Sequence, residues 1–569
     1  MAEDSFREEI AELVTAAVSG KLDKNKISAL IETPQQEFGD YAFPCFALAK
    51  AFKKSPYQIA SELADKIKPT ESITKVEAKG PYVNFFADTG KIAAATIARI
   101  MDEKNNYGSG KNKNKKVVIE YPSPNTNKPL HLGHVRNMLL GQSLSRILSF
   151  SGCNVFQVNL NNDRGIHICK AMLAYKLFGR NKNPEKKPDH FVGDFYVLYG
   201  KKAAENPELE RRVQEMLQGW EKGDKETIRL WKKINSWALE GFKETYKTFG
   251  IEFDRVYNES GHYLEGKKIV LEAYKKGLLK KDDKGNILAE LKKYGMPDKV
   301  LLRADGTSIY ITQDINLAKL KYNDFRMDKS IYVVGSEQVL HFRQLFKILQ
   351  LLKIYGGELY HLAHGMVYLP EGKMKSREGK VVDADNLVEE MISIADKEIK
   401  KRYKNLSRAE IKKRSMQIGI GSIRFFVLKY DPLKDFVFNP EESISFEGET
   451  GPYVQYAHAR ICSVLEKHGG KVSGNADFNL LKEKEERFLI RLLSQFPATA
   501  EAAANNYKPL LIARYLLDLS QAFNNFYHQY PILKADEETK KARLLLIAAV
   551  KQVLKNGLNL LAIEAPERM

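Results

Sequence analysis

The chain has 569 residues, 43% of them hydrophobic, and its 90 lysines and arginines outweigh 72 acidic residues to give a net charge of +18. A chain of this length is expected to fold as about three or four units. Its longest apolar candidate, LLLIAAV at 544–550, is far too short to cross a membrane, and the acidic start MAEDSFREEIAEL is unlike a signal peptide, so we expect a cytoplasmic protein.

The positive charge favours a polyanionic partner such as nucleic acid, because each lysine or arginine placed against a phosphate releases a bound counterion. A lysine-rich solvated surface would give the same composition. The cysteines, Cys45, Cys153, Cys169 and Cys462, are too widely spaced for a C-x-x-C metal site and too few for a disulfide framework. We therefore expect reduced thiols, no membrane partner and no structural zinc.

The first section of the chain runs from residue 1 to about 110. Its apolar and aromatic parts are IETPQQEFGDYAFPCFALAKAF (31–52) and VEAKGPYVNFFAD (76–88). The lysine run GSGKNKNKK (108–116) closes this section and has the composition of a linker.

A β-α-β alternation opens the second section, residues 111–440. KVVIEY (116–121) is a short β-branched run, which predicts a buried strand. Prolines exclude a helix through the following turn, and from about Leu132 the apolar residues take helical spacing. NVFQVNL (154–160) predicts the next strand, so the pattern favours a parallel sheet with a ligand crevice at the carboxyl ends of its strands.

Residues from about 180 to 300 interrupt this pattern. They begin with the charged, proline-bearing RNKNPEKKPDH and continue in long helical stretches, which indicates a helical insertion. Strands are predicted again at TSIYIT (307–312) and KSIYVVG (329–335), each leading into a helix. The insertion thus divides the predicted sheet.

The third section, residues 441–569, has helical periodicity almost throughout. Leu516, Leu519, Phe523 and Phe526 fall on one helical face, which is typical of a packed helix. An all-helical bundle is therefore predicted.

Two histidines three residues apart, His131 and His134, stand at the predicted strand-to-helix junction. A helix N-terminus binds anions through its free N–H groups and positive dipole end, and the imidazoles add donors for a developing phosphate charge. Gly133 leaves room for a flat base or ribose against the backbone. A nucleotide site is predicted, although an isolated H-x-x-H is more often a surface pair or a partial metal site. HLAHG (361–365) has similar letters without the proline-rich turn and is predicted to be structural.

A glycine-bracketed basic loop, LPEGKMKSREGKVV (369–382), is a second candidate element, with its core at 371–382. Such a loop can clamp the β- and γ-phosphates of a triphosphate, although by itself it would more often be a solvated surface loop.

HLGH and, some 240 residues later, KMKSREG together resemble the two signatures of class I aminoacyl-tRNA synthetases. Six segments agree in order, over the full length, with the arginyl-tRNA synthetase family: SPNTNKPLHLGHVRN, NDRGIHICK, TSIYITQDI, GSEQVLHFRQ, TGPYVQYAHARICSVL and LLAIEAPERM. The resemblance implies a multidomain α/β protein. Its parts would be a Rossmann-like parallel-sheet catalytic domain with a helical insertion, a small α+β N-terminal domain that holds the tRNA elbow, and an all-helical anticodon-binding bundle.

The resemblance also implies a reaction. Arginine is activated by ATP to arginyl-adenylate and then transferred to the 3′ end of tRNA-Arg, with release of pyrophosphate and AMP. His131 and His134 match the family's histidine pair and would hold the nucleotide beside Gly133 and stabilise the α-phosphate in the transition state. Lys373 and Met374 belong to the second signature, where Lys373 would meet the departing phosphates and Mg²⁺ would neutralise the remaining charge. Positioning and charge stabilisation dominate such chemistry.

The second signature departs from the family-wide pattern K-M-S-K-S. Lys375, Ser376 and Arg377 follow Met374, so a serine replaces the second lysine. Many arginine enzymes share this loss and carry a lysine just upstream of the histidine pair, which Lys128 matches. We hypothesise that Lys128 supplies the missing charge from the other side of the crevice.

An arginine side chain presents a planar guanidinium with five donors and no acceptor, so its pocket needs carboxylate or carbonyl oxygens. The resemblance assigns arginine binding to Glu120, Asn125, Tyr310, Asp314 and Gln338, with Asn125 at the α-amino end. Without the family match, each acidic residue would be interpreted as a surface or capping residue. Gln338 is preferred over the adjacent Glu337 only by that match.

For RNA, the resemblance assigns Tyr82 and Asn84 in GPYVNFF to a loop base, and an aromatic face beside an amide suits an unstacked base. A core position on an alternating strand is an equal interpretation for Tyr82. Tyr456 and Arg460 in YVQYAHAR lie in the section that resembles the anticodon-binding bundle and are predicted to contact RNA, whereas Ala457 is predicted to face the core.

The family further implies that activation requires bound tRNA, which is an induced fit. We expect a monomer, since no association segment is evident. Two alternatives stay open. Another class I synthetase, for cysteine or glutamate, is disfavoured by the absence of cysteine clusters and by like-charge repulsion from Glu120 and Asp314. An inactive RNA-binding scaffold is disfavoured by the intact set of His131, His134 and Lys373.

Overall fold

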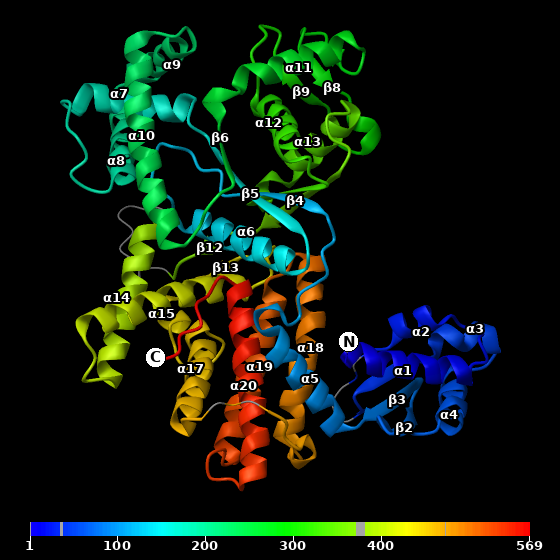
Figure 1. Ribbon diagram of the computed structural model, residues 1–569. Coiled ribbons are helices and arrows are strands. Elements are labelled where there is room, and N and C mark those ends of the chain that lie inside the picture. Colours follow the sequence, from blue (N-terminus) through cyan, green and yellow to red (C-terminus); the bar gives the residue numbers. More distant parts are fainter. Residues whose placement is uncertain (1, 33, 35–37, 371–381, 471, 473) are drawn as a thin grey trace.

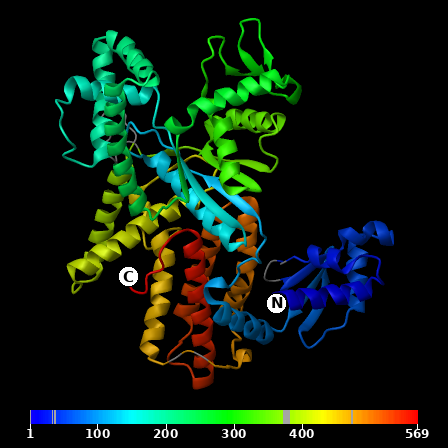
Figure 2. The same cartoon turned by 45° about the horizontal axis from the view of Figure 1, so that its top comes forward.

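The computed structural model describes residues 2–32, 34, 38–370, 382–470, 472 and 474–569. It contains an N-terminal unit, a central sheet with a lobe on each side, and a helical bundle below the sheet (Figure 1, Figure 2). Buried apolar residues between positions 6 and 87 form a core of their own, whereas one continuous core joins the sheet to the bundle. None of the described helices is long and apolar enough to cross a membrane.

The N-terminal unit is a three-stranded antiparallel sheet, in the order β1-β3-β2, covered by helices, which confirms its predicted α+β character. Its elements are α1 (Ala2–Ala17), α2 (Lys24–Leu30), β1 (Tyr41–Pro44), α3 (Ala49–Phe52), α4 (Pro56–Lys66), β2 (Ile73–Lys79) and β3 (Tyr82–Ala87). The next helix, α5 (Thr89–Glu103), buries Ala93, Ile97 and Ile100 in the core of the bundle. The section boundary predicted at about 110 thus falls after a helix that packs with the bundle.

A five-stranded parallel sheet in the order β11-β10-β4-β5-β6 forms the centre of the molecule. Its strands are β4 (Lys116–Glu120), β5 (Asn154–Asn161), β6 (Arg255–Asn258), β10 (Lys329–Gly335) and β11 (Glu358–His364). The chain builds outward from β4 on one side and then returns to build outward from β10 on the other. This reversal creates a switch point between β4 and β10, where ligands bind at the carboxyl ends of the strands in Rossmann-like folds.

Helix α6 (Leu132–Phe150) follows β4 and lies between the sheet and the bundle (Figure 1). Asn137 donates to the backbone oxygen of Val333 in β10 at 2.7 Å, and Ser143 donates to the backbone oxygen of Leu560 at 2.9 Å. Almost the whole of α6 is buried, so the residue that begins it is held from both sides.

Two lobes extend from the sheet (Figure 1). One consists of α7 (Ile166–Phe178), α8 (Pro188–Glu205), α9 (Glu208–Glu221) and α10 (Lys225–Thr248). The other consists of α11 (Tyr263–Lys275), β7 (Lys280–Lys281), β8 (Ile287–Ala289), β9 (Lys299–Leu302), α12 (Tyr310–Phe325) and α13 (Val339–Leu351). Strand β6 lies between these lobes in the chain and pairs with β5, so the range 180–300 contains a strand of the central sheet.

The prediction of a strand at TSIYIT (307–312) was wrong, because α12 begins at Tyr310. Ile311, Ile315 and Ala318 are buried on one side of this helix, in the core of its lobe. A short β-branched run has the same composition in a buried helix as in a buried strand, and only the longer periodicity distinguishes them.

The bundle comprises α17 (Gly451–His468), α18 (Lys484–Asn506), α19 (Leu510–Gln529) and α20 (Glu537–Leu560), with α5 packed against it. Helices α14 (Ala384–Arg402), α15 (Arg408–Leu428) and α16 (Pro440–Ser443) connect it to the sheet, and β12 (Val367–Tyr368) pairs with β13 (Phe436–Val437) nearby. The predicted all-helical character of residues 441–569 is confirmed.

Candidate active site

Predicted residues of the nucleotide and arginine sites lie near the carboxyl ends of the central strands. Glu120 is the last residue of β4, and Gln338 closes a short 3-10 turn directly after β10. Asn125 bridges to Asn162, just beyond β5, and His131 caps α6. The strands β4, β5 and β10 therefore bring residues separated by more than 200 positions to one edge of the sheet.

The histidine pair forms a reciprocal cap at the start of α6. His131 Nδ1 accepts from the backbone N–H of Gly133 at 3.2 Å, and His134 Nδ1 accepts from the backbone N–H of His131 at 3.1 Å. The ring centroids are 3.8 Å apart. A neutral imidazole that accepts at Nδ1 carries its proton on Nε2. Both rings are therefore held with an Nε2–H group as the remaining donor, which suits a phosphate oxygen.

The histidines are neutral at physiological pH in this structure. Burial, with a contribution from Lys128, lowers the pKa of His131 to about 4. Burial lowers the pKa of His134 further below its usual value, and His131, Lys128 and His364 add to this effect. The pair can thus donate hydrogen bonds but brings no formal charge, and Lys128 is the described cation that acts on both rings.

Lys128 is a half-buried ammonium close to the histidines. Burial lowers its pKa, and its charge in turn lowers the pKa of both rings. No carboxylate lies within 4 Å of Lys128 among the residues that the structure describes. An anion placed against α6 would therefore supply the missing counter-charge.

Gly133 leaves little room for a side chain beside the His131 ring. A Cβ atom at this position would lie 3.1 Å from His131 Cε1 and 3.2 Å from His131 Nδ1. A larger residue would press on the imidazole that caps the helix, so the absent side chain keeps the cap in place.

Glu120 is already neutralised by a lysine that sequence reasoning missed. Lys321 of α12 donates to Glu120 Oε2 at 2.6 Å, and its ammonium lies 3.7 Å from the ring centroid of Tyr332. Lys321 is 0% exposed and Glu120 6%. Burial by itself lowers the pKa of Lys321, but Glu120 and Tyr332 together outweigh burial and raise it.

The other predicted arginine contacts lie on α12 and at the start of α13. Tyr310 and Asp314 are one helical turn apart, and Tyr310 is exposed. Asp314 Oδ2 and His341 Nε2 are 2.8 Å apart, which ties α12 to the helix that Gln338 precedes. Gln338 is exposed. Tyr310 and Gln338 are therefore accessible from solvent, whereas Asp314 already has a partner in His341.

A buried acidic group next to Asp314 was not found from the sequence. Glu259, which directly follows β6, is 7% exposed, and burial, with the carboxylates of Asp163 and Asp314, raises its pKa to about 7 against the opposing effect of Arg164. His262 is also buried, and neither of its ring nitrogens has a hydrogen-bond partner in the described part of the chain. A carboxylate at a strand end was the available signal, but the four-residue strand RVYN is too short and polar to be recognised.

The basic loop supplied two further predictions, Lys373 and Met374, which lie outside the described residues. Its flanks are described. Arg136 of α6 donates to the backbone oxygen of Met366 at 3.1 Å on the entry side, and Leu132 N–H donates to the backbone oxygen of Val382 at 2.9 Å on the exit side. The two signatures are thus joined through α6.

The HLAHG segment forms the end of β11. His361 Nε2 lies 3.0 Å from the backbone oxygen of Val334, and His364 Nδ1 lies 3.1 Å from that of Gly365. His364 is close enough to His134 to lower the pKa of that ring. His364 of this second pair therefore lies near His134 of the first pair.

Three family models match the chain. Residues 96–440 match the catalytic domain of tRNA synthetases class I (R), residues 3–87 match the arginyl tRNA synthetase N terminal domain, and residues 454–569 match the DALR anticodon binding domain. The chain belongs to the arginyl-tRNA synthetases.

Relatives resemble this synthetase over its full length. It is 46% identical over 560 residues to an arginine–tRNA ligase of Treponema denticola, and the matched region covers 95% of this chain and 94% of the relative. It is 42% identical over 572 residues to an arginine–tRNA ligase of Parabacteroides distasonis, with 95% of each chain covered. The solved arginyl-tRNA synthetase of Thermus thermophilus superposes with a TM-score of 0.82 at 26% identity, over 99% of this chain and 100% of that one.

The predicted RNA contacts of the synthetase differ in accessibility. In the N-terminal unit, Tyr82 is half-buried and lies edge-on to the exposed ring of Phe46, whereas Asn84 is only 2% exposed. Asn84 is therefore not available to a base in this conformation. In the bundle, Arg460 stacks over Tyr456 and Tyr527 and donates to Asn524 at 3.0 Å.

Proposed function

We propose that this chain activates arginine with ATP to arginyl-adenylate and transfers the arginyl group to the 3′ end of tRNA-Arg, releasing pyrophosphate and AMP. The observation that carries this proposal is the pair of neutral imidazoles capping α6 at the switch point of the sheet, in a chain of this family. Asp314 supplies an acidic group near the same edge, and Glu120, at the end of the neighbouring strand, is a carboxylate already paired with Lys321.

In the first step the arginine carboxylate attacks the α-phosphorus and the bond to pyrophosphate breaks. Charge builds on the α-phosphate oxygens, where the Nε2–H groups of His131 and His134 and the positive end of α6 stabilise it. Lys128 and Lys373 contribute charge around the departing phosphates. Mg²⁺ enters with ATP as part of the substrate and neutralises the remainder.

Arginine selection rests on carboxylates at the strand ends. The guanidinium has no acceptor, so its donors pair with Asp314, Glu259 and Glu120, while Asn125, Tyr310 and Gln338 complete the contacts. An acidic amino acid would be repelled from the same edge. Glu259 is buried with Arg164, Asp163 and Asp314 around it and still has a raised pKa, so a bound guanidinium would further favour its ionised form.

The Michaelis constant for arginine is expected to fall about tenfold from about pH 6 to about pH 8. Glu259 has a folded-state pKa raised to about 7, so it holds a proton at the lower pH and must lose it to pair with a guanidinium. The same raised pKa means that the folded chain keeps a proton on Glu259 that the unfolded chain releases, so stability falls as pH rises from about 4.5 to about 7, and bound arginine offsets that loss. Steady-state pyrophosphate exchange across pH measures this effect.

The Glu259→Gln variant is the control for this pH dependence. It should bind arginine more weakly at high pH and lose the dependence. A wild-type KM for arginine that stays flat across the range, or a variant with an unchanged profile, would contradict the assignment.

Replacing Lys128 by alanine is expected to lower the rate of adenylate formation by about 10- to 100-fold. The reason is that an ammonium without a carboxylate partner among the described residues would be lost from the phosphate side of the histidine pair. Lys128→Arg keeps the charge and should retain more activity. Rapid-quench measurement of adenylate formation would test this, and near-normal rates in Lys128→Ala would contradict the role.

Transfer requires tRNA, and we propose that activation requires it as well. Tyr82 in the N-terminal unit and Tyr456 and Arg460 in the bundle would contact RNA, and the net charge of +18 favours a polyanionic partner. Asn84 would contact RNA only after the side chains that cover it move. We further propose that the enzyme works as a monomer in the cytoplasm, without structural zinc.

Pyrophosphate exchange into ATP tests the proposed function, with each proteinogenic amino acid in turn and with or without unfractionated tRNA. Exchange with arginine only in the presence of tRNA is the expected result. Exchange with another amino acid would overturn the specificity. Exchange with arginine in the absence of tRNA would overturn the tRNA requirement. Absence of exchange under all conditions would favour an RNA-binding scaffold.

A further inference from the structure

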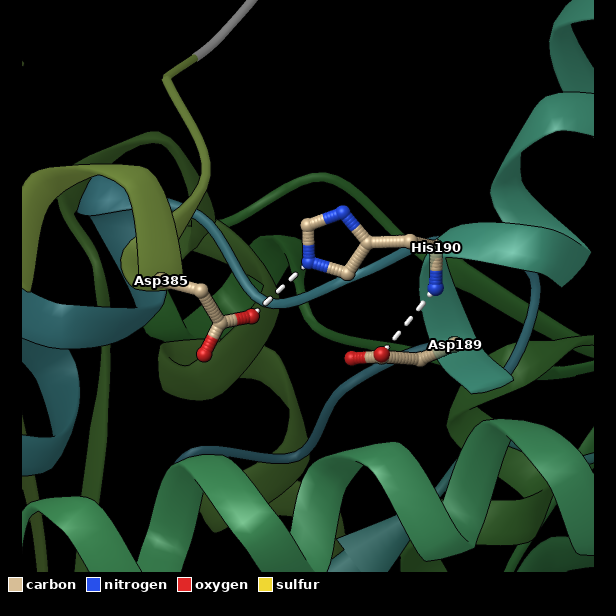
Figure 3. Close-up of side chains that lie close together, drawn as sticks. All are labelled: Asp189, His190 and Asp385. Atoms are coloured by element: carbon tan, nitrogen blue, oxygen red, sulfur yellow. Dashed lines mark hydrogen bonds and ion pairs between the residues drawn. The ribbon is translucent and has the colours of Figure 1, made fainter. Parts of the chain in front are cut away.

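A lysine-centred ion-pair network connects α8, α10 and α14 behind the histidine pair. Lys187, which precedes α8, donates to Asp385 Oδ2 at 2.7 Å, to Asp189 Oδ2 at 3.2 Å and to Thr245 Oγ1 of α10 at 2.5 Å. His190 Nε2 lies 2.8 Å from Asp385 Oδ2. Figure 3 shows His190 directed at Asp385, with Asp189 beside it on the same helix.

The network has the ligand types of a metal site but is not assigned as one. Asp189, His190 and Asp385 are the one group in the described residues whose potential ligand atoms all lie within 4.8 Å of one another. The ammonium of Lys187 already contacts both carboxylates, so a metal ion would meet a like charge at short range. The positive charge that such a group of acids requires is therefore supplied by the chain itself.

The members of the network are largely withdrawn from water. Asp189 is 0% exposed, and the side chains of Lys187, His190 and Asp385 are each about four-fifths buried. Burial by itself raises the pKa of Asp385, but hydrogen bonds from His190 and Lys187 outweigh this and lower it. Asp385 thus remains charged and bound to two cationic or potentially cationic partners, which fixes the first turn of α14.

The residues just before Asp385 pair with the histidine signature. Ala384 N–H donates to the backbone oxygen of Leu130 at 2.8 Å, Leu132 N–H donates to that of Val382 at 2.9 Å, and His131 and Asp383 form an antiparallel bridge between these bonds. Only Ala384 separates the bridged Asp383 from Asp385. Movement of the first turn of α14 would therefore move the backbone of His131.

Helix α8 also contacts the turn that precedes the histidines. A Cβ atom on Gly193 would lie 2.7 Å from Pro129 Cδ and 3.5 Å from Lys128 Cα. The same helix that carries Asp189 and His190 thus packs directly on the turn. The helical lobe reaches the histidine signature by two routes, one through Asp385 and one through Gly193.

We propose that Lys187 and Asp385 are positioning residues for the histidine pair, which hold the backbone of His131 in register with α14 and with the lobe formed by α7 to α10. The proposal rests on the proposed function in adenylate formation. The described contacts of both side chains are to other side chains of the protein. They act by fixing where the Nε2–H groups point, and a displacement of about 1 Å in such groups costs about 100-fold in rate.

The first test is pyrophosphate exchange with arginine and tRNA in Lys187→Met and Asp385→Asn. Groups that act in the transition state affect kcat rather than KM, so kcat should fall by about 10- to 100-fold while the KM for ATP changes less than about threefold. Lys187→Arg should recover most of the activity. The double variant, Lys187→Met with Asp385→Asn, should have a kcat no lower than that of the less active single variant, because both changes break the same network.

Glu486→Gln is the matched control. The Arg543–Glu486 pair in the bundle is 2.7 Å long, and its side chains are 9% and 0% exposed, so this variant also breaks a buried ion pair but one remote from the sheet. It should lower thermal stability without changing kcat. An equal fall in kcat in Glu486→Gln, or normal kcat in a folded Lys187→Met, would overturn the proposal.

A second measurement does not depend on activity. The chain has 11 histidines, so the Cε1–Hε1 NMR signals of histidine-labelled protein can be assigned with single variants. The signals of His131 and His134 should shift in Lys187→Met and Gly193→Ala but not in Glu486→Gln. Unshifted signals would overturn the proposal even if the wild-type chain did not activate arginine, whereas shifted signals without wild-type exchange would mean that only the proposed function had failed.

Discussion

Replacing His134 by asparagine is expected to lower the rate of adenylate formation by about 100- to 1,000-fold. The rate in the His134→Gln variant should be about tenfold higher than in His134→Asn. The difference follows from the two ring nitrogens. Nδ1 caps the helix by accepting from His131 N–H, and Nε2–H is left for the phosphate. Asparagine can mimic Nδ1 but not Nε2–H, while the longer glutamine side chain can place an amide N–H near the position of Nε2.

Single-turnover formation of adenylate, measured with arginine, ATP and tRNA, would separate the two variants. Melting temperature is the control, since loss of the cap lowers stability without removing the phosphate donor. Equal rates in the asparagine and glutamine variants would contradict the assignment of Nε2–H.

Replacing Lys321 by methionine is expected to lower the free energy of unfolding by about 3–5 kcal/mol, because the substitution leaves the buried Glu120 carboxylate without its partner. The double variant Lys321→Met with Glu120→Leu should recover most of this loss, since two apolar side chains replace the pair. Urea unfolding followed by tryptophan fluorescence is a suitable measurement, because Trp220, Trp231 and Trp237 all lie in the lobe next to the sheet.

The same variants test whether Glu120 also contacts arginine. If it does, the double variant should be stable and yet have a raised KM for arginine, because the acidic contact is gone. A stable double variant with a normal KM for arginine would restrict Glu120 to a structural role. If Lys321→Met had the same free energy of unfolding as the wild-type chain, the predicted contribution of the Lys321–Glu120 pair to stability would be contradicted.

Much of the fold was predictable because local patterns encode it. The runs KVVIEY, NVFQVNL and KSIYVVG form β4, β5 and β10, and the helix predicted from about Leu132 begins there. Strand and helix periods repeat within about 15 residues, so they can be read without knowing the rest of the chain. The wrong assignment of TSIYIT as a strand and the failure to predict β6 have the same reason, since each segment is too short for its period to be decisive.

The sequence by itself determined the family, the order of the sections and the place of the histidine pair at the start of a helix. Tertiary structure alone decided the electrostatics of the site. Lys321 neutralises Glu120 from 201 positions away, Lys187 meets Asp385 from 198 positions away, and Glu259 joins Asp314 across the sheet edge. A charge interaction depends on distance in space and on exclusion of water, and neither is encoded by neighbouring letters in a chain. The pattern therefore specifies which side chains are present, and packing determines which of them are paired, neutral or charged.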